Sequence, residues 1–268
     1  MLNDPVAALA ARPGGALALL VASEGGFPRR PGAMMAVWPD GTACGRLGAG
    51  CIDADLALHA EGEAPVARLI YGQGGPVDLP LPCGGSIRIA LIRRPEPAWL
   101  AAIIADRQAR RTGQWRVDLT TGQAVAAGPG DGFALTLHPP VALHLHGNGD
   151  EAQALAAMAQ GLGLPCHLDR PELLPDAHSA VITLHHDHDR ELPPLRAALA
   201  SPAFFIGALG SRRAQTARIM ALSQAGMSVA DCARIHGPIG VVAPVREPAL
   251  LAASVLTQVL AEYDRAFG

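Results

Sequence analysis

The chain has 268 residues, half of them apolar and few of them aromatic, with a formal net charge of −3. This length suits one large domain or two moderate ones with buried cores, and the mild acidity argues against a nucleic-acid partner. No apolar run is long enough to span a bilayer, and we expect no signal peptide. Five cysteines without a C-x-x-C spacing favour a reducing compartment, so we expect a cytoplasmic protein.

The N-terminal part predicts a β-rich domain, because short apolar segments alternate with glycine- and proline-rich turns. We expect a helix at residues 53–61, after a glycine-rich bend, and an amphipathic helix at residues 98–111. Pro139-Pro140 marks the expected boundary between a first domain, residues 1–139, and a second, residues 140–268. Strands are expected at residues 16–23, 33–38, 68–72, 86–92, 115–120 and 133–138.

The second domain opens with residues 141–152, VALHLHGNGDEA, which indicate a buried strand that turns sharply into a helix. Gly147, Gly149 and Ala152 fit the pattern G-x-G-x-x-A, and a second short strand leads to Asp169. This succession predicts the opening of a Rossmann-type sheet. Glycine lets a phosphate approach the helix N-terminus, and the acid is placed for a ribose hydroxyl. The alternative is an ordinary tight turn in an α/β domain.

The remaining segments predict a parallel sheet. Strands are expected at residues 165–168, 180–184 and 203–208, and helices at residues 152–162, 189–199, 212–225, 228–235 and 248–266. Only about ten residues separate Asp169 from the next strand, too few for a crossover helix and a third strand. The expected strand order is therefore 2-1-4-5 in the usual naming. The predicted fold class is α/β, a β-rich N-terminal domain followed by a truncated Rossmann-like parallel sheet.

Three polar groups follow neighbouring strands of this sheet, at the carboxyl edge where ligands of α/β proteins bind. They are His146, the loop at residues 185–188 with His186 and His188, and the turn Gly210-Ser211-Arg212. We expect them to border one pocket that accepts an anion, because Arg212 and the N–H groups after Gly210 carry positive potential. For any single histidine, a solvated polar loop is the simpler interpretation.

Two cysteines lie in glycine-rich bends of the first domain, Cys51 and Cys83, and Gly84-Gly85 follow the second of them. Such bends let backbone N–H groups face a ligand, and a place just before a helix start would favour a reactive thiolate at Cys51. Arg29, in a proline- and glycine-rich loop, can be aimed at an anion. The alternatives are buried cysteines and a solvated arginine. We assign Cys44, Cys166 and Cys232 to the buried class.

In this order, the motifs resemble the XdhC/CoxI family, the accessory proteins of xanthine dehydrogenase and related molybdenum hydroxylases. The matching segments are Pro28-Arg29 with Gly32, Met34-Met35, residues 48–53 (GAGCID), Cys83-Gly84-Gly85, Gly147-Asn148-Gly149, residues 183–188 (TLHHDH), residues 205–213 (FIGALGSRR), residues 238–240 (PIG) and Ser254. The resemblance covers nearly the whole chain, and residues 205–213 are its most specific part.

The resemblance implies a carrier rather than a turnover enzyme. Such a protein binds the molybdenum cofactor (molybdopterin), protects it while its terminal sulfur is installed, and delivers it to an apo-xanthine dehydrogenase or a related hydroxylase. A cysteine desulfurase and a second copy of the chain are further implied partners, and Cys51 and Cys83 would be the thiols next to molybdenum. The residues that would hold the cofactor are Arg29, Cys51, Cys83, Gly84, Gly85, His146, Gly147, Gly149, Asp169, His186, His188, Gly210, Ser211 and Arg212.

Two other functions fit the same residues. An NAD(P)-dependent oxidoreductase would use the crevice with a histidine as proton relay, and Asp169 favours NAD while Arg170 leaves NADP open. A nucleotide-sensing interaction module would bind there without chemistry. The chain departs from the family pattern where Asp150 replaces the usual histidine and Ala249-Leu250 replace the usual acidic pair. Because a negative charge at a helix start repels phosphate, we expect weak NAD(H) binding.

Overall fold

The computed structural model describes residues 4–48, 50–72, 81, 84–242 and 244–268. The chain divides into two compact units, Met1–His138 and Pro139–Gly268, called here the first and the second unit. Each unit has its own sheets and its own hydrophobic clusters.

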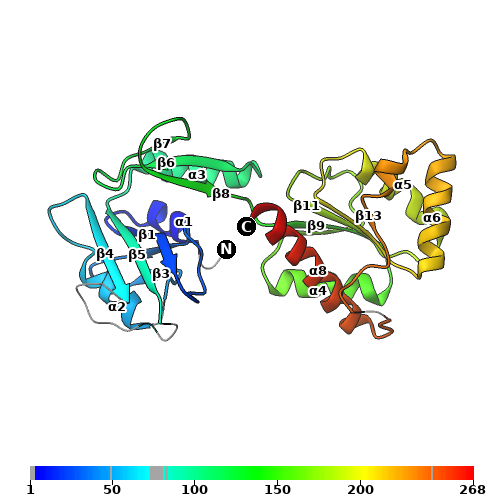
Figure 1. The fold of residues 1–268 in the computed structure, drawn as a ribbon, viewed down its shortest axis with the longest axis horizontal. Coiled ribbons are helices and arrows are strands. Elements are labelled where there is room, and N and C mark those ends of the chain that lie inside the picture. Colours follow the sequence, from blue (N-terminus) through cyan, green and yellow to red (C-terminus); the bar gives the residue numbers. More distant parts are fainter. Residues whose placement is uncertain (1–3, 49, 73–80, 82–83, 243) are drawn as a thin grey trace. The chain divides into compact units, whose positions relative to one another are not determined.

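A five-stranded antiparallel sheet forms the centre of the first unit (Figure 1). Its strand order is β3 (Ala43–Cys44), β2 (Met34–Val37), β1 (Ala16–Glu24), β5 (Ser86–Arg93) and β4 (Val66–Gly72). β1 is buried on both faces, since Ala18 and Leu20 belong to one hydrophobic cluster while Leu17 and Leu19 belong to another. This explains why its sequence is a continuous apolar run rather than an alternating one.

Different elements cover the two faces of this sheet. Helix α2 (Gly50–Leu58) packs Ile52 and Leu56 into the cluster of Leu20. On the other face lie α1 (Pro5–Ala11), α3 (Pro97–Gln108) and a small antiparallel sheet of β7 (Ala124–Ala126), β6 (Gly113–Val117) and β8 (Phe133–Leu137). Strand β6 ends at Val117 rather than at the predicted residue 120, because Asp118 accepts from the N–H groups of Thr120 and Thr121 and forms a turn.

Helix α1 was not predicted, although its start carries a signal. Asp4 Oδ1 caps it by accepting from the N–H groups of Val6 at 3.0 Å and Ala7 at 3.3 Å, and Pro5 occupies the first helical position. Arg107 of α3 donates to the same Asp4 carboxylate at 2.5 Å. The cap therefore also ties the N-terminal helix to α3.

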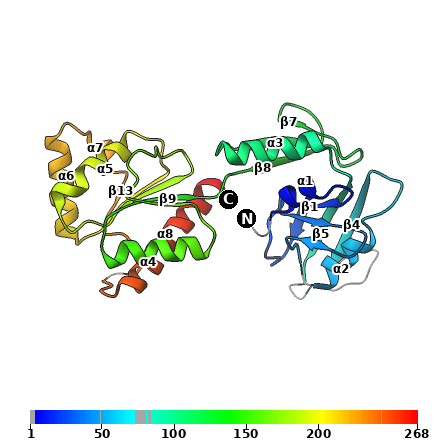
Figure 2. The ribbon, with the colours of Figure 1, turned by 180° about the vertical axis from the view of Figure 1, so that it is seen from behind.

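A parallel five-stranded sheet forms the centre of the second unit (Figure 2). Its order is β10 (Cys166–Leu168), β9 (Ala142–His146), β11 (Ser179–Thr183), β12 (Phe205–Ala208) and β13 (Ile235–His236). The first four strands confirm the predicted order 2-1-4-5. Strand β13 was not predicted, and the helix expected at residues 228–235 ends early, as α7 (Val229–Cys232). Ile235 instead pairs with Ile206, and the Gln215 side chain donates to its carbonyl oxygen at 3.0 Å.

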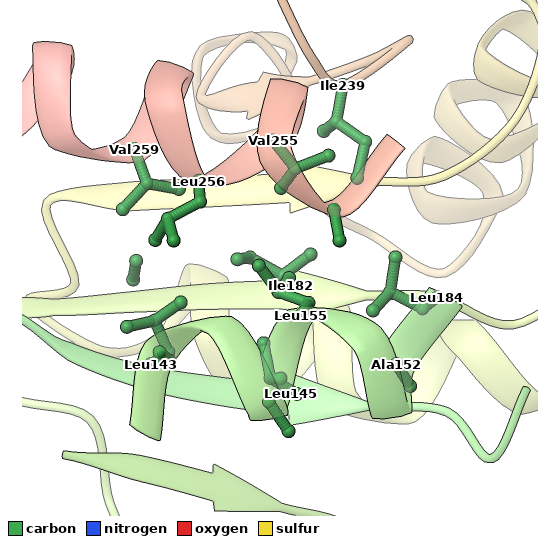
Figure 3. Packing of buried hydrophobic residues seen from close by; sticks show 14 of the residues in the cluster. Leu143, Leu145, Ala152, Leu155, Ile182, Leu184, Ile239, Val255, Leu256 and Val259 are labelled. Atoms are coloured by element: carbon green, nitrogen blue, oxygen red, sulfur yellow. The ribbon is translucent and has the colours of Figure 1, made fainter. Parts of the chain in front are cut away.

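Helices cover this sheet unequally. On one face, α4 (Asp150–Gly161) and α8 (Pro248–Phe267) lie side by side, and Leu155, Val255 and Val259 pack onto Leu143 and Ile182 of the sheet (Figure 3). On the other face, α5 (His188–Leu199) and α6 (Arg212–Gln224) cover only β11, β12 and their surroundings. Residues 169–178, which connect β10 to β11, contain neither strand nor helix. As predicted, the crossover helix and the third strand of a full Rossmann half are missing.

Specific polar contacts hold the last helix, α8, against the rest of the second unit. Glu247 caps α8 by accepting from the Leu250 N–H at 2.9 Å, and Tyr263 donates to the Pro139 carbonyl oxygen at 2.6 Å. The Ser254 hydroxyl accepts from the Val242 N–H at 2.8 Å, and a Cβ on Gly240 would lie 2.7 Å from that hydroxyl. No helix among the described residues combines the length and the apolar character needed to cross a membrane.

A buried ion pair joins α5 to α6. Arg218 donates to Glu191 at 3.0 and 2.8 Å, and both side chains are only 1% exposed. The same guanidinium donates to the Leu209 carbonyl oxygen at 2.6 Å and to the Gln215 side chain. The loop after β12 is therefore fixed from inside the core, since a buried guanidinium needs all of these acceptors.

We expect Arg218→Met to destabilise the second unit by about 3–5 kcal/mol, because it leaves the Glu191 carboxylate buried and unpaired. Urea unfolding followed by circular dichroism should show the loss. Tryptophan fluorescence should not shift, since Trp38, Trp99 and Trp115 all lie in the first unit. The exposed Arg213→Met on the same helix is the matched control. An Arg218→Met protein as stable as this control would contradict the prediction.

Candidate functional site

A glycine-rich loop folds back onto the start of α2 in the first unit. Asp53 Oδ1 accepts from the N–H groups of Leu47 at 3.3 Å and Gly48 at 3.0 Å. The helix begins at Gly50, three residues before the predicted start, because Asp53 organises the loop from within the helix rather than capping it. Cys51 therefore lies in the first turn of α2, not before it, and its side chain is exposed.

The far side of α2 is anchored to the sheet. The Tyr71 hydroxyl of β4 donates to Asp55 Oδ2 at 2.7 Å. Burial, together with the Asp55 carboxylate, raises the pKa of Tyr71 well above its usual value. The phenol stays protonated over the whole physiological range, so this bond holds α2 in place at any working pH.

A cavity of about 620 Å³ opens beside the glycine-rich loop. Its lining includes Arg29, Arg46, Gly50 and Asp53. Both guanidinium groups are exposed, and neither has a hydrogen-bond or ion-pair partner among the described residues. Two free guanidinium groups and the N-terminus of α2 make this cavity attractive to an anion. Arg29 was predicted as a site residue and Arg46 was not. The position of Arg46 inside the glycine-rich bend was the signal that could have identified it.

The structure does not bring Gly84 and Gly85 to this cavity. They precede β5, and a Cβ on Gly85 would lie 2.0 Å from the Glu24 carbonyl oxygen of β1. The close approach of two backbones therefore accounts for Gly85. Cys83 lies outside the described residues. Among the described residues, no three His, Cys, Asp or Glu side chains gather as a metal site.

In the second unit, the turn from β9 into α4 has the geometry that its sequence predicts. Gly147 has a φ of +146°, and a Cβ there would lie 2.9 Å from the Leu184 carbonyl oxygen. Its N–H donates to Asp169 Oδ1 at 3.0 Å, so the acid after β10 supports the turn itself. Gly149 is the N-cap of α4 and offers no side-chain acceptor.

The start of α4 is acidic. Asp150 and Glu151 both occupy its first turn, which stabilises the helix through its dipole and repels a phosphate from the same place. Glu151 Oε1 lies 3.6 Å from His186 Nε2. The negative charge that the sequence introduces at Asp150 is therefore reinforced by a second carboxylate.

His146 is a half-buried titratable group at this edge of the sheet. Burial lowers the pKa of His146 below its usual value near 6.5. Asp169 opposes this shift, and His185 adds to it. His146 is therefore neutral at pH 7, and its ring offers one donor and one acceptor to a ligand.

The structure divides the expected single pocket into two cavities, so that prediction is wrong. His146, Asp169, His185 and Arg190 line a cavity of about 860 Å³ on the α5 side of the sheet. A cavity of about 460 Å³ is lined by the other half of the rim, Glu151, His186, Gly210, Ser211 and Arg246. Both histidines follow the end of β11 at Thr183, and they line different cavities, His185 the larger one and His186 the smaller one.

The remaining predicted residues have local structural roles or stand apart. The Ser211 hydroxyl caps α6 by accepting from the Ala214 N–H at 3.2 Å. Arg212 is exposed and does not line either cavity. His188 is the first residue of α5, and its side chain lies outside the described part of the structure. Sequence reasoning missed Arg190 and Arg246, since no motif surrounds either of them.

Comparisons with known proteins agree with this two-unit organisation. A model described as the XdhC and CoxI family matches residues 8–66, and one described as the XdhC Rossmann domain matches residues 143–259. The molybdenum cofactor insertion chaperone PaoD of Escherichia coli is 34% identical, over 97% of this chain and 86% of its own length. The uncharacterized protein YqeB of the same organism is 27% identical, over 94% of this chain and 44% of its own length.

A crystal structure described as a xanthine dehydrogenase from Bacillus halodurans superposes with a TM-score of 0.74, over 98% of this chain and 95% of that one. At 18% identity, this likeness concerns the fold alone. The parallel sheet and the glycine turn from β9 into α4 define an α/β protein with a Rossmann-type second unit. Its sequence relatives are more specific: the chain belongs to the XdhC and CoxI family.

We expect Cys51 to react with a thiol reagent before Cys166 and Cys232. Cys51 is exposed, Cys232 is buried, and burial raises the pKa of the half-buried Cys166 thiol. Labelling of the native protein, followed by mass spectrometry of its peptides, measures the order. Cys51→Ser should remove the fast phase. If Cys51 reacted only after unfolding, its exposed position in α2 would be wrong.

We also expect the second unit to lose stability as the pH falls below about 6.5. Below that value the unfolded chain protonates His146 while the native state, with its lowered pKa, does not; above it the stabilisation is complete. His146→Gln should flatten this dependence, which is at most about 1.4 kcal/mol per pH unit for one group. Circular dichroism melts between pH 5 and 8 test it. Equal slopes in variant and wild type would contradict the assignment.

Proposed function

We propose that the chain is a molybdenum cofactor insertion chaperone, which binds the cofactor, protects it, and delivers it to an apo-hydroxylase of the xanthine dehydrogenase type. The observation that carries this proposal is the 34% identity to a chaperone of that name over 97% of the chain. Family membership supports it for both units, because one family model falls in each of them.

The chemistry of the cargo suits the cavity in the first unit. The cofactor is an anion that combines a phosphate, a dithiolene and a molybdenum centre. Arg29 and Arg46 supply two guanidinium groups without internal partners, and the α2 N-terminus adds its dipole. The exposed Cys51 thiol follows Gly50 on α2 but does not itself line the cavity. As a soft ligand it is of the kind that tolerates a molybdenum centre. This chain's part is to bind, orient and shield the cofactor, and no covalent step is required of it.

The oxidoreductase alternative has weaker support. Two carboxylates stand at the α4 N-terminus, where a pyrophosphate would bind. The connection between β10 and β11 would have to supply the third strand beside a bound adenine, and it contains no strand. We therefore expect NAD(H) and NADP(H) binding to be weak or undetectable by calorimetry, and micromolar affinity would favour the alternative.

Metal content and delivery test the main proposal. The protein is purified from molybdate-fed cells that make the cofactor, and its molybdenum is counted per chain. It is then mixed with a purified apo-hydroxylase, whose activity reports transfer. Stoichiometric molybdenum and restored activity are expected. Protein that never acquires molybdenum in such cells would overturn the proposal.

We expect Arg29→Ala and Arg46→Ala each to reduce the retained molybdenum by roughly tenfold, the scale of one charge-assisted hydrogen bond. Thermal stability should stay close to wild type, since neither exposed side chain has an internal partner. Arg196→Ala, an exposed arginine on α5, is the matched control. Retention equal to this control in both variants would remove the first-unit cavity from the binding site.

A further inference from the structure

The cavity on the α5 side of the parallel sheet is a consequence of the missing crossover helix. In a full Rossmann half, a helix between the third and fourth strands covers this part of the sheet. Here residues 169–178 pass over it as an irregular segment, and a cavity of about 860 Å³ remains between that segment and α5. This size falls within the range of small-molecule sites.

The cavity has an apolar body. On one side, Pro193, Pro194 and Ala197 of α5 are spaced so that they share one helix face. Pro171 and Leu173 of the irregular segment lie on the other side, and Val181 of β11 contributes from the sheet. Prolines are rigid and have no N–H to leave unsatisfied, so such walls suit the two apolar faces of a flat ring.

Most polar groups of the cavity lie at its carboxyl-edge end. The exception is Ser201, just after α5, whose hydroxyl donates to the Ala198 carbonyl oxygen. At the carboxyl edge, Asp169, His146, His185 and Arg190 come together. The Gly147 N–H occupies Asp169 Oδ1 alone, which leaves the other oxygen and further lone pairs to accept from a ligand. Neutral His146 adds a donor or an acceptor beside it, since burial lowers its pKa. Arg190 is exposed and has no partner among the described residues.

We propose that this cavity holds a heteroaromatic ring with a 2-amino-4-oxopyrimidine edge, whose ring N–H and amino group donate to Asp169, while Arg190 receives an anionic substituent of the ligand. Two adjacent donors on a flat edge match the fork of a carboxylate, as a guanidinium does. The pterin of the cargo carries this edge, and so does guanine. The inference rests on the proposed function in choosing the pterin of the molybdenum cofactor as the occupant. The molybdenum retained by Arg29→Ala, Arg46→Ala and Asp169→Asn decides between this cavity and the one beside α2.

Calorimetric titration of the purified, cofactor-free full chain tests the recognition of this edge. The probes are 6-hydroxymethylpterin and guanosine monophosphate, which carry the edge, and adenosine monophosphate, which does not. Pterin binding tighter than adenosine monophosphate binding is expected. Guanosine monophosphate binding without pterin binding would overturn the pterin as occupant. Equal binding of adenosine monophosphate and pterin, or no binding of either, would overturn the recognition of the edge.

Matched variants locate the contact. Asp169→Asn keeps an oxygen that can accept from the Gly147 N–H and loses the charge, so the turn should survive while pterin affinity falls about tenfold. Glu172→Gln, an exposed carboxylate on the same segment that does not line the cavity, should bind as wild type. Ala197→Leu should weaken binding by filling the apolar body. Unchanged affinity in both Asp169→Asn and Ala197→Leu would place any binding elsewhere.

The two proposals fail in different ways. If the wild type carries molybdenum and Asp169→Asn retains as much of it, the chaperone function stands and this site falls. If the wild type never acquires molybdenum, the chaperone function falls, and the titration still decides whether the cavity binds the pterin edge.

Discussion

The short connection between β10 and β11 is the constraint on which the second unit depends. A parallel strand cannot follow another without a crossover, and residues 169–178 are too few to supply both a helix and an extra strand. The chain therefore crosses directly from β10, over β9, to β11, and the sheet keeps the order that places β9 between β10 and β11. One half of one face then lacks a helix, and the polar residues at the end of β9 border a cavity instead of a packed layer.

That constraint changes what a familiar sequence pattern means. In a complete dinucleotide site, the acid after the second strand and the glycine turn serve one ligand together. Here Asp169 holds the Gly147 turn, while Asp150 and Glu151 make the helix start acidic. The glycines persist for a structural reason, because Gly147 packs against the Leu184 carbonyl oxygen where no Cβ fits. The glycine pattern can thus specify the geometry of the turn even though the acidic residues at the helix start no longer favour phosphate binding.

Local patterns predicted the strand order, the absence of a third strand and the glycine turn, because each depends on residues close in sequence. Contacts between distant residues could not be predicted in this way. The Glu191–Arg218 pair forms only when α5 and α6 lie on the same sheet face, and no spacing in the sequence specifies that pairing. Strand β13 likewise depends on Gln215 and on the edge of β12. The division of the rim could not be predicted either, because His185 and His186 lie beyond the end of β11, where no strand alternation fixes the directions of their side chains.

The arginines of the chain separate into two kinds, and the separation is informative about the site. Arg218 donates four hydrogen bonds to acceptors within the second unit, so its charge serves the fold. Arg29, Arg46 and Arg190 line cavities and have no partner within the described part of the chain, so their charge remains available to a ligand. In a protein with net charge −3, such arginines must attract anions locally against an overall field that repels them. The charge of these arginines therefore favours a specific anionic ligand at each cavity over the general binding of polyanions.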